Sequence, residues 1–96
     1  MDDLTFAVEE TASGGRLTAT NPAGTAELTF SKAGDTRIIA DHTGVPAAMG
    51  GRGVGTQLVE RLHDYARERG LKVVATCPFV RAKMVKHPEW RDVLDR

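Results

Sequence analysis

Residues 50 to 55, Gly-Gly-Arg-Gly-Val-Gly, place four glycines directly in front of an apolar pattern of helical period. From there on, apolar side chains recur every three or four residues, at Val54, Leu58, Leu62 and Tyr65. This spacing predicts an amphipathic helix that ends at Gly70. Arg67 and Arg69 lie in its last turn, where their positive charges interact favourably with the negative end of the helix dipole. Because glycine costs a helix roughly 1 kcal/mol relative to alanine, glycines at its entrance need a separate explanation.

Short strand-like runs fill the first 41 residues, at 4–8, 16–20, 25–30 and 37–40. Turn-forming clusters separate them, at Gly14-Gly15, Asn21 to Gly24 and Ala33 to Asp35. In the third run Ala26, Leu28 and Phe30 alternate with polar residues, so one face is buried and the other faces water. The regular spacing of these runs predicts an antiparallel meander.

A further strand-like run, 72–76, follows the predicted helix. Together with run 37–40 it forms a strand–helix–strand unit, which predicts a parallel pair with a right-handed crossover. After Cys77-Pro78, residues 79–86 have helical character and end before Pro88, and Trp90 is expected to fold back on the core. The sequence therefore predicts an α/β (α+β) fold: a mixed, mainly antiparallel sheet with one long helix and a short C-terminal helix.

Length and composition limit the classes of protein that fit. A chain of 96 residues is expected to form one domain, 1–96, and such a chain buries only about 60–65% of its unfolded surface. Its 41% hydrophobic and 27% charged residues are typical of a soluble globular protein without a membrane span. The start MDDLTFAVEE lacks the features of a signal peptide, and the lone Cys77 excludes an internal disulfide. We therefore expect a reducing, cytoplasmic location.

The formal net charge of zero hides an asymmetry between the two parts of the chain. Residues 1–41 carry a net charge of −4, and residues 42–96 carry +4. An anionic ligand would therefore favour the C-terminal part. Because no basic run with interleaved aromatic residues occurs, a nucleic-acid partner is not expected.

The glycines have a functional explanation at a helix entrance. The first turn of a helix has backbone N–H groups without intrahelical partners, and glycine lets phosphate oxygens approach them. Arg52, among the glycines, adds a charged donor. A tight turn that packs on the sheet without any ligand is the alternative. The Walker A pattern is absent, and the Rossmann fingerprint is matched only at its first two glycines.

Cys77 precedes a proline and is predicted to be the N-cap of the second helix. The positive end of that helix, with Arg81 and Lys83 nearby, is expected to lower the pKa of the thiol and favour a nucleophile. The alternative is a small buried apolar residue. His42 could act as a general base because it titrates near neutral pH, whereas His63 is expected at the surface or the boundary of the core.

Four segments together resemble the GNAT superfamily of N-acetyltransferases. They are the glycine run, which aligns with the family pattern Q/R-x-x-G-x-G/A, and the stretches DHTGVP, TCPFV and HPEW. The resemblance covers about residues 27 to 92 and points to the shortest branch of the family, which carries a Cys-Pro-Phe motif. Gly50 replaces the usual Gln or Arg of the pattern, and Lys83 stands where relatives often carry a tyrosine that protonates the leaving thiolate.

The resemblance implies acetyl-CoA as cofactor and an amine as acceptor. It places the pyrophosphate on amides of residues 51–56 and the pantetheine arm beside the strand that ends at Val45. The implied catalytic residue is Cys77, and no metal is expected. His42, the candidate general base, lies just before the strand that the resemblance places beside the cofactor. The implied cofactor contacts are Val45, Gly50, Gly51, Arg52, Gly53, Val54, Gly55, Thr56, Phe79 and Lys83.

The predicted function is transfer of an acetyl group from acetyl-CoA to an unidentified amine, with Cys77 as a possible acetyl carrier. A non-catalytic acyl-CoA-binding or partner-binding module is the alternative, because so short a chain has little room for an acceptor site. A monomer or a weak homodimer, without a membrane or nucleic-acid partner, is expected.

Overall fold

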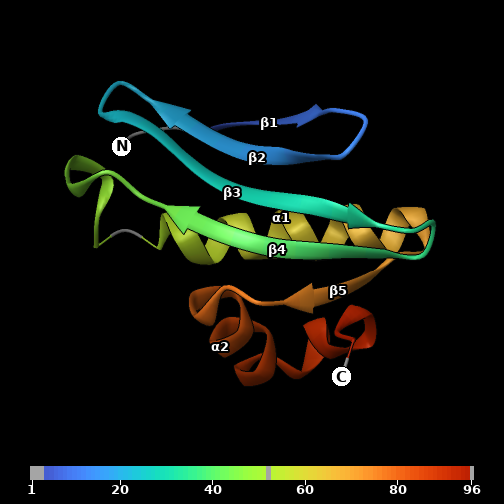
Figure 1. Cartoon of the computed structure of the whole chain (residues 1–96). Coiled ribbons are helices and arrows are strands. Elements are labelled where there is room, and N and C mark those ends of the chain that lie inside the picture. Colours follow the sequence, from blue (N-terminus) through green and yellow to red (C-terminus); the bar gives the residue numbers. More distant parts are fainter. Residues whose placement is uncertain (1–3, 52, 96) are drawn as a thin grey trace.

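A five-stranded sheet packed against one long helix makes up most of the computed structural model, which describes residues 4–51 and 53–95 (Figure 1). The strands follow one another across the sheet in chain order. The first four pair antiparallel, and the last two pair in parallel. Their bounds are β1 Thr5–Glu10, β2 Gly14–Asn21, β3 Gly24–Ala33, β4 Arg37–Gly44 and β5 Lys72–Ala75. The predicted mixed, mainly antiparallel sheet is confirmed.

Helix α1, Val54–Arg69, connects the two parallel strands and covers one face of the sheet. Its apolar stripe is fully buried at Leu58 and Leu62, and it packs on the alternating side chains of β3, including Leu28. The predicted helix end is confirmed, since Gly70 adopts the left-handed conformation with φ +67° and donates its N–H to the last turn. The apolar residues thus recur every second residue in the strands and about every 3.6 residues in α1, and these two apolar faces pack together to form the core.

The C-terminal part covers the β5 side of the sheet. Helix α2, Pro78–Lys86, begins as predicted with Cys77 as N-cap, and the 3-10 helix η2, Pro88–Val93, brings the buried Trp90 back onto α1. Leu94 then bridges Val73 of β5. A further 3-10 helix, η1 (Ala47–Met49), follows β4. None of the helices in the described parts of the chain has the length and apolar character needed to span a membrane.

The predicted turn at Gly14-Gly15 is wrong, because both glycines lie inside β2. A Cβ atom on Gly14 would lie 2.2 Å from the Phe30 carbonyl oxygen, and one on Gly15 would lie 2.8 Å from the tip of the Phe30 ring. These glycines therefore allow close packing within the sheet rather than a turn. The turn between β1 and β2 instead uses Thr11 to Ser13, where the Thr11 side chain accepts a hydrogen bond from the Gly14 N–H.

Candidate functional site

The glycine-rich loop enters α1 through left-handed backbone. Gly51 has φ +76° and Gly53, the N-cap, has φ +72°, and a Cβ on either residue would meet no atom within 4 Å. The first α-helical hydrogen bond of α1 runs from the Gln57 N–H to the Gly53 carbonyl. The N–H groups of residues 54–56 precede that bond, so they have no acceptor within the helix. This arrangement can accept an anion. Arg52, predicted as an additional donor, lies outside the described residues.

Gly55 has a different role from the glycines before it. A Cβ at this position would lie 2.8 Å from the Cζ atom of the Phe79 ring and 3.6 Å from a methyl group of Val45. Gly55 thus leaves room for Phe79 of α2, which lies directly on the first turn of α1. Phe79 and Val45 are 38% and 37% exposed, which makes them an apolar surface beside the loop.

The remaining predicted cofactor residues differ in what surrounds them. Gly50 has ordinary backbone angles, φ −68° and ψ 159°, so its conformation does not require glycine. Val54 is buried in the core, and Thr56 is half-buried in the first turn of α1. The Lys83 ammonium lies 5.5 Å from the centre of the Phe79 ring, which places a positive charge beside the apolar surface. The structure therefore gathers Val45, Gly55, Phe79 and Lys83 at the entrance of α1.

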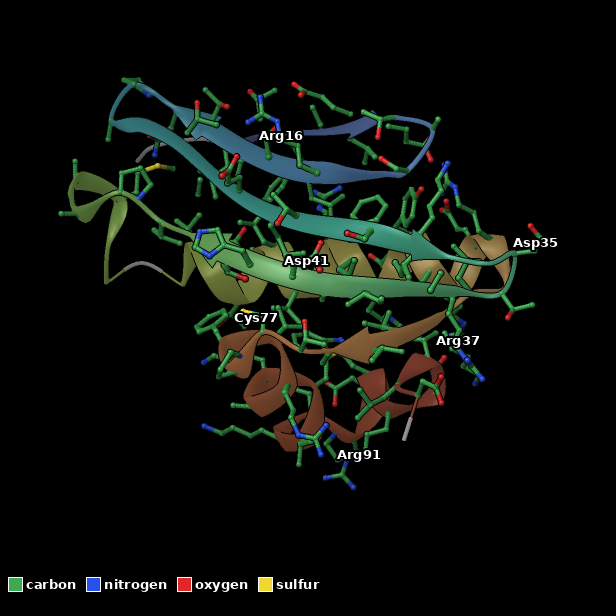
Figure 2. The ribbon with its side chains drawn as sticks, viewed as in Figure 1. Arg16, Asp35, Arg37, Asp41, Cys77 and Arg91 are labelled. Atoms are coloured by element: carbon green, nitrogen blue, oxygen red, sulfur yellow. The ribbon has the colours of Figure 1, made fainter. Side chains whose placement is uncertain are left out.

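Cys77 lies between the end of β5 and the start of α2 (Figure 2). Its side chain is buried, and its Sγ atom lies 3.6 Å from the Thr43 hydroxyl of β4. The Cys77 N–H donates to the Ala40 carbonyl at 3.0 Å, and the Thr76 hydroxyl donates to the same oxygen at 2.9 Å. Both hydrogen bonds follow Ala40–Ala75, the last pair of the parallel ladder between β4 and β5.

The pKa of Cys77 lies below its ordinary value. Burial raises the pKa, but backbone N–H groups at the first turn of α2, from Val80 and Phe79, lower it, as do the hydroxyl and the N–H of Thr43. The hydrogen bonds outweigh burial. The expected direction of the shift is therefore confirmed, although the predicted contribution of Arg81 and Lys83 is absent from its causes.

His42 is not brought together with Cys77. The β3–β4 pairing shifts by one residue, because Phe30 pairs with Ala40 whereas Thr29 pairs with His42. Directly opposed residues share a face of the sheet, so His42 lies with Thr29 on the face away from α1. Its ring lies over Gly44, where a Cβ would be 3.3 Å from Nε2. Any role of His42 as a base would therefore be exercised from the opposite face.

Thr43 was not singled out from the sequence, although it lies in the DHTGVP stretch. Its position beside Cys77 depends on the register shift, and no pattern in the sequence marks that shift. Within residues 4–51 and 53–95, His, Cys, Asp and Glu side chains form no group of three suited to hold a metal ion.

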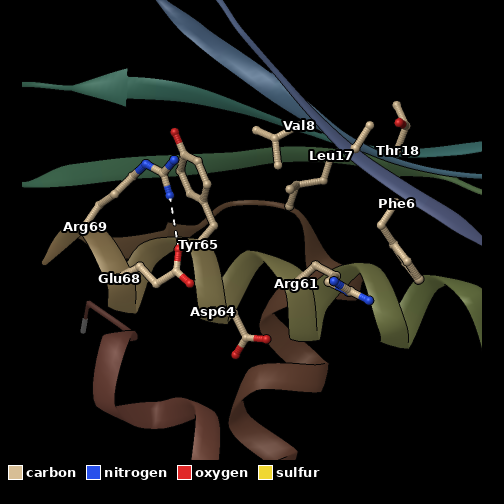
Figure 3. A pocket seen from close by; sticks show the side chains of 10 residues that line it. Phe6, Val8, Leu17, Thr18, Arg61, Asp64, Tyr65, Glu68 and Arg69 are labelled. Atoms are coloured by element: carbon tan, nitrogen blue, oxygen red, sulfur yellow. Dashed lines mark ion pairs between the residues drawn. The ribbon is translucent and has the colours of Figure 1, made fainter.

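A groove of about 350 Å³ lies away from these residues, between β1 and α1 (Figure 3). Its two arginines are engaged within the groove itself. Arg61 stacks on the Phe6 ring at 4.1 Å, and Arg69 stacks on Tyr65 at 3.9 Å while it lies 3.7 Å from Glu68. None of the predicted site residues lines this groove.

The architecture and the comparisons agree on the kind of protein. A mainly antiparallel sheet extended by one parallel strand, with a glycine-entered helix between the two parallel strands, defines a mixed α+β class. A family model described as GCN5-related N-acetyl-transferase matches residues 16–93, and the chain belongs to this family.

A solved structure supports the same conclusion about the fold. The NMR solution structure of a GCN5-like protein from Staphylococcus aureus is 29% identical to this chain. The match has a TM-score of 0.69 and covers 93% of this chain and 87% of that one. A comparison with curated proteins gave no match.

Proposed function

We propose that the protein is an N-acetyltransferase that transfers the acetyl group of acetyl-CoA to an amine. The observation that carries this proposal is the contact of Phe79 with Gly55. Phe79 follows Cys77 by two residues, so this contact brings the open N-terminus of α1 and the Cys77 thiol to the same end of the molecule. An anion site and a nucleophile would then lie along one bound ligand.

The described residues fit the diphosphate of CoA. Three N–H groups at the first turn of α1 have no acceptor within the helix, and the space that a Cβ would fill at Gly51 and Gly53 is open. The positive net charge of residues 42–96 also favours an anion. Beside the loop, the apolar surface of Val45 and Phe79 leads toward Cys77, as the pantetheine arm would require.

Cys77 is proposed as the acetyl carrier. Acetyl-CoA supplies an activated acetyl group as a thioester. Attack by the Cys77 thiolate on the acetyl carbonyl carbon forms a bond to Sγ and breaks the thioester bond, with CoA released as its thiolate. Attack by the amine on the same carbon then breaks the bond to Sγ and regenerates the Cys77 thiolate. The amine loses one proton to water, because His42 lies on the opposite face of β4 and is not brought together with Cys77.

The binding part is tested by the stabilisation that CoA produces in Gly53→Ala and Gly34→Ala. Both glycines have φ +72° and open space above them, but Gly34 lies in the β3–β4 turn. For wild type and Gly34→Ala we expect CoA at 100 times its dissociation constant to add about 2.7 kcal/mol of stability. At the same CoA concentration Gly53→Ala should gain clearly less stability, because its methyl group would occupy the space in front of the first-turn N–H groups. Equal gains in all three proteins would contradict the proposed site.

The chemical part is tested by intact mass after incubation with acetyl-CoA without an acceptor. Wild type should gain one acetyl group, and Cys77→Ser, which has no thiol, should not. CoA-induced stabilisation without acetyl transfer to any added amine would indicate an acyl-CoA-binding protein instead. Absence of both stabilisation and transfer would refute the proposed function.

A further inference from the structure

The register shift between β3 and β4 inserts one extra residue, Asp41, into β4. Ala40 pairs with Phe30 and His42 with Thr29, so no residue of β3 lies opposite Asp41. Such a bulge reverses the facing of every residue beyond it. Thr43 consequently pairs with Leu28, whose buried side chain faces α1, instead of pointing to the open face.

The extra residue is held in place by a side-chain contact on the open face. The Ser31 hydroxyl donates a hydrogen bond to the Asp41 carboxylate at 2.6 Å. A hydrogen bond to a charged acceptor is stronger than one between neutral groups. Figure 2 shows Asp41 on β4, above the level of Cys77 at the start of α2. The bulge is thus a fixed feature of the strand beside the thiol.

On the inner face, the bulge brings a hydroxyl to the sulfur. Thr43 Oγ1 lies 3.6 Å from Cys77 Sγ, which is within hydrogen-bonding distance for sulfur. Backbone N–H groups of Phe79 and Val80, in the first turn of α2, also bond the sulfur. The Cys77 N–H is bound to the Ala40 carbonyl of β4. Threonine suits this place because its branched side chain has few allowed rotamers, so the hydroxyl keeps its direction.

We infer that Thr43 is a positioning residue for Cys77: its hydroxyl donates a hydrogen bond to the thiolate and fixes the direction in which the sulfur points. This inference deepens the proposed function, because it concerns the same thiol. Other charged groups on the surrounding elements are placed differently. His42 lies on the opposite face of β4, and Arg81 and Lys83 of α2 are not among the groups that shift the pKa of Cys77.

The test is the rate of Cys77 alkylation by iodoacetamide as a function of pH, measured without acetyl-CoA. Thr43→Val removes the hydroxyl and keeps the shape of the side chain. It should move the midpoint of the profile to higher pH and slow alkylation at neutral pH about three- to tenfold, as expected for loss of one hydrogen bond of ordinary net strength. Thr43→Ser, which retains a hydroxyl, should restore a profile close to that of wild type.

Thr76→Val is the matched control, because the Thr76 hydroxyl binds the Ala40 carbonyl and not the sulfur. Its alkylation midpoint should coincide with that of wild type. A Thr43→Val profile that coincides with the wild-type profile would overturn the inference, as would a Thr43→Ser profile shifted as far as that of Thr43→Val. Should Thr43→Val not fold, as judged by circular dichroism, Thr43→Ala serves in its place.

Failure of this inference can be distinguished from failure of the proposed function. If Thr43→Val shifts alkylation while Cys77→Ser retains full acetyl transfer, the thiol is positioned as described but does not carry the acetyl group. If Cys77 is acetylated and Thr43→Val alkylates like wild type, the carrier role stands and the role of Thr43 is wrong.

Discussion

The glycines at the start of α1 are favoured for two separate physical reasons. Gly51 and Gly53 occupy left-handed backbone, which residues with a Cβ adopt at a cost. Gly55, in contrast, has ordinary helical backbone, and its lack of a Cβ leaves room for the Phe79 ring that lies on it. The access of phosphate oxygens to backbone N–H groups therefore does not explain all of these glycines. Substitution by alanine should change stability differently at the two kinds of position.

Gly53→Ala should lower the free energy of unfolding by about 1–2 kcal/mol, because alanine must adopt a left-handed conformation. Gly34→Ala should lose a similar amount, since Gly34 shares φ +72° and open surroundings. Urea unfolding monitored by circular dichroism measures both changes. A Gly53→Ala protein as stable as wild type would show that the loop relaxes without strain.

Gly55→Ala should be coupled to Phe79. The added methyl group would overlap the ring tip, but the ring is partly exposed and can move, so the change in unfolding free energy should stay within about 1 kcal/mol. In a Phe79→Ala background the same substitution should be more favourable by about 0.5–1 kcal/mol, because the overlap is gone. A double-mutant cycle from urea unfolding gives this difference. Additive effects would mean that the two residues do not touch.

At the scale of elements, the contact between α1 and η2 depends on a buried histidine. His63 of α1 is only 6% exposed, and its Nε2 atom lies 2.8 Å from the Asp92 carboxylate of η2. The expectation that His63 lies at the surface or the boundary is therefore wrong. Its position on α1 alone could not reveal this, because Asp92 is 29 residues further along the chain. Burial raises the pKa of Asp92, but the hydrogen bond and charge of His63, with the charge of Arg67, lower it below its ordinary value.

Asp92 should contribute to the acid sensitivity of the fold. Because its pKa is lowered in the folded state, the stabilisation is complete above the unfolded pKa of about 3.9 and is lost as the pH falls through the lower folded value. Asp92→Asn should therefore lose stability at neutral pH and show a shallower decline below pH 4 than wild type. Urea midpoints measured between neutral pH and the acid range test this. Asp35→Asn, in the β3–β4 turn, is the control and should follow the wild-type decline.

The β4 bulge is the element that sequence reasoning could not provide. Strand and helix periods, the Cys77 N-cap with its following proline, and the Gly70 end of α1 all predict their elements correctly, because each is encoded within a few neighbouring residues. The bulge instead depends on which residue of β3 lies opposite β4. The residue types of Asp41, His42 and Thr43 do not indicate whether the strand contains a bulge. The sequence therefore could not predict on which side of the sheet His42 and Thr43 lie, nor that Thr43 is part of the candidate site.

For the molecule as a whole, Trp90 joins the last element to the rest. It is buried, it stacks on His87 at 4.2 Å between ring centres, and it belongs to the single core cluster formed by the described residues. The predicted return of this residue onto the core is confirmed. Beyond it, Leu94 lies beside Val73, and Asp95 pairs with Arg37 at 2.7 Å.

Trp90→Ala should destabilise the whole protein by about 3–5 kcal/mol, the usual cost of removing a buried large aromatic side chain. Since small proteins have only about 5–15 kcal/mol of stability, a large unfolded fraction at physiological temperature is expected. The loss should appear in the urea midpoint. Val85→Ala, at a 44% exposed position of α2, should change stability by less than about 0.5 kcal/mol and controls for general effects of truncation. Equal losses in both variants would show that the C-terminal part is not a component of the common core.

The extra residue in β4 also affects how relatives of this chain can be aligned with it. A relative without it would match equally well with a gap placed anywhere between Ala40 and Thr43, but each placement would assign different residues to the inner and outer faces. At 29% identity, sequence scores alone give little basis for choosing among these placements. Whether a relative carries a hydroxyl equivalent to that of Thr43 beside the sulfur must therefore be judged by superposing the strands of the two structures and not from a sequence alignment.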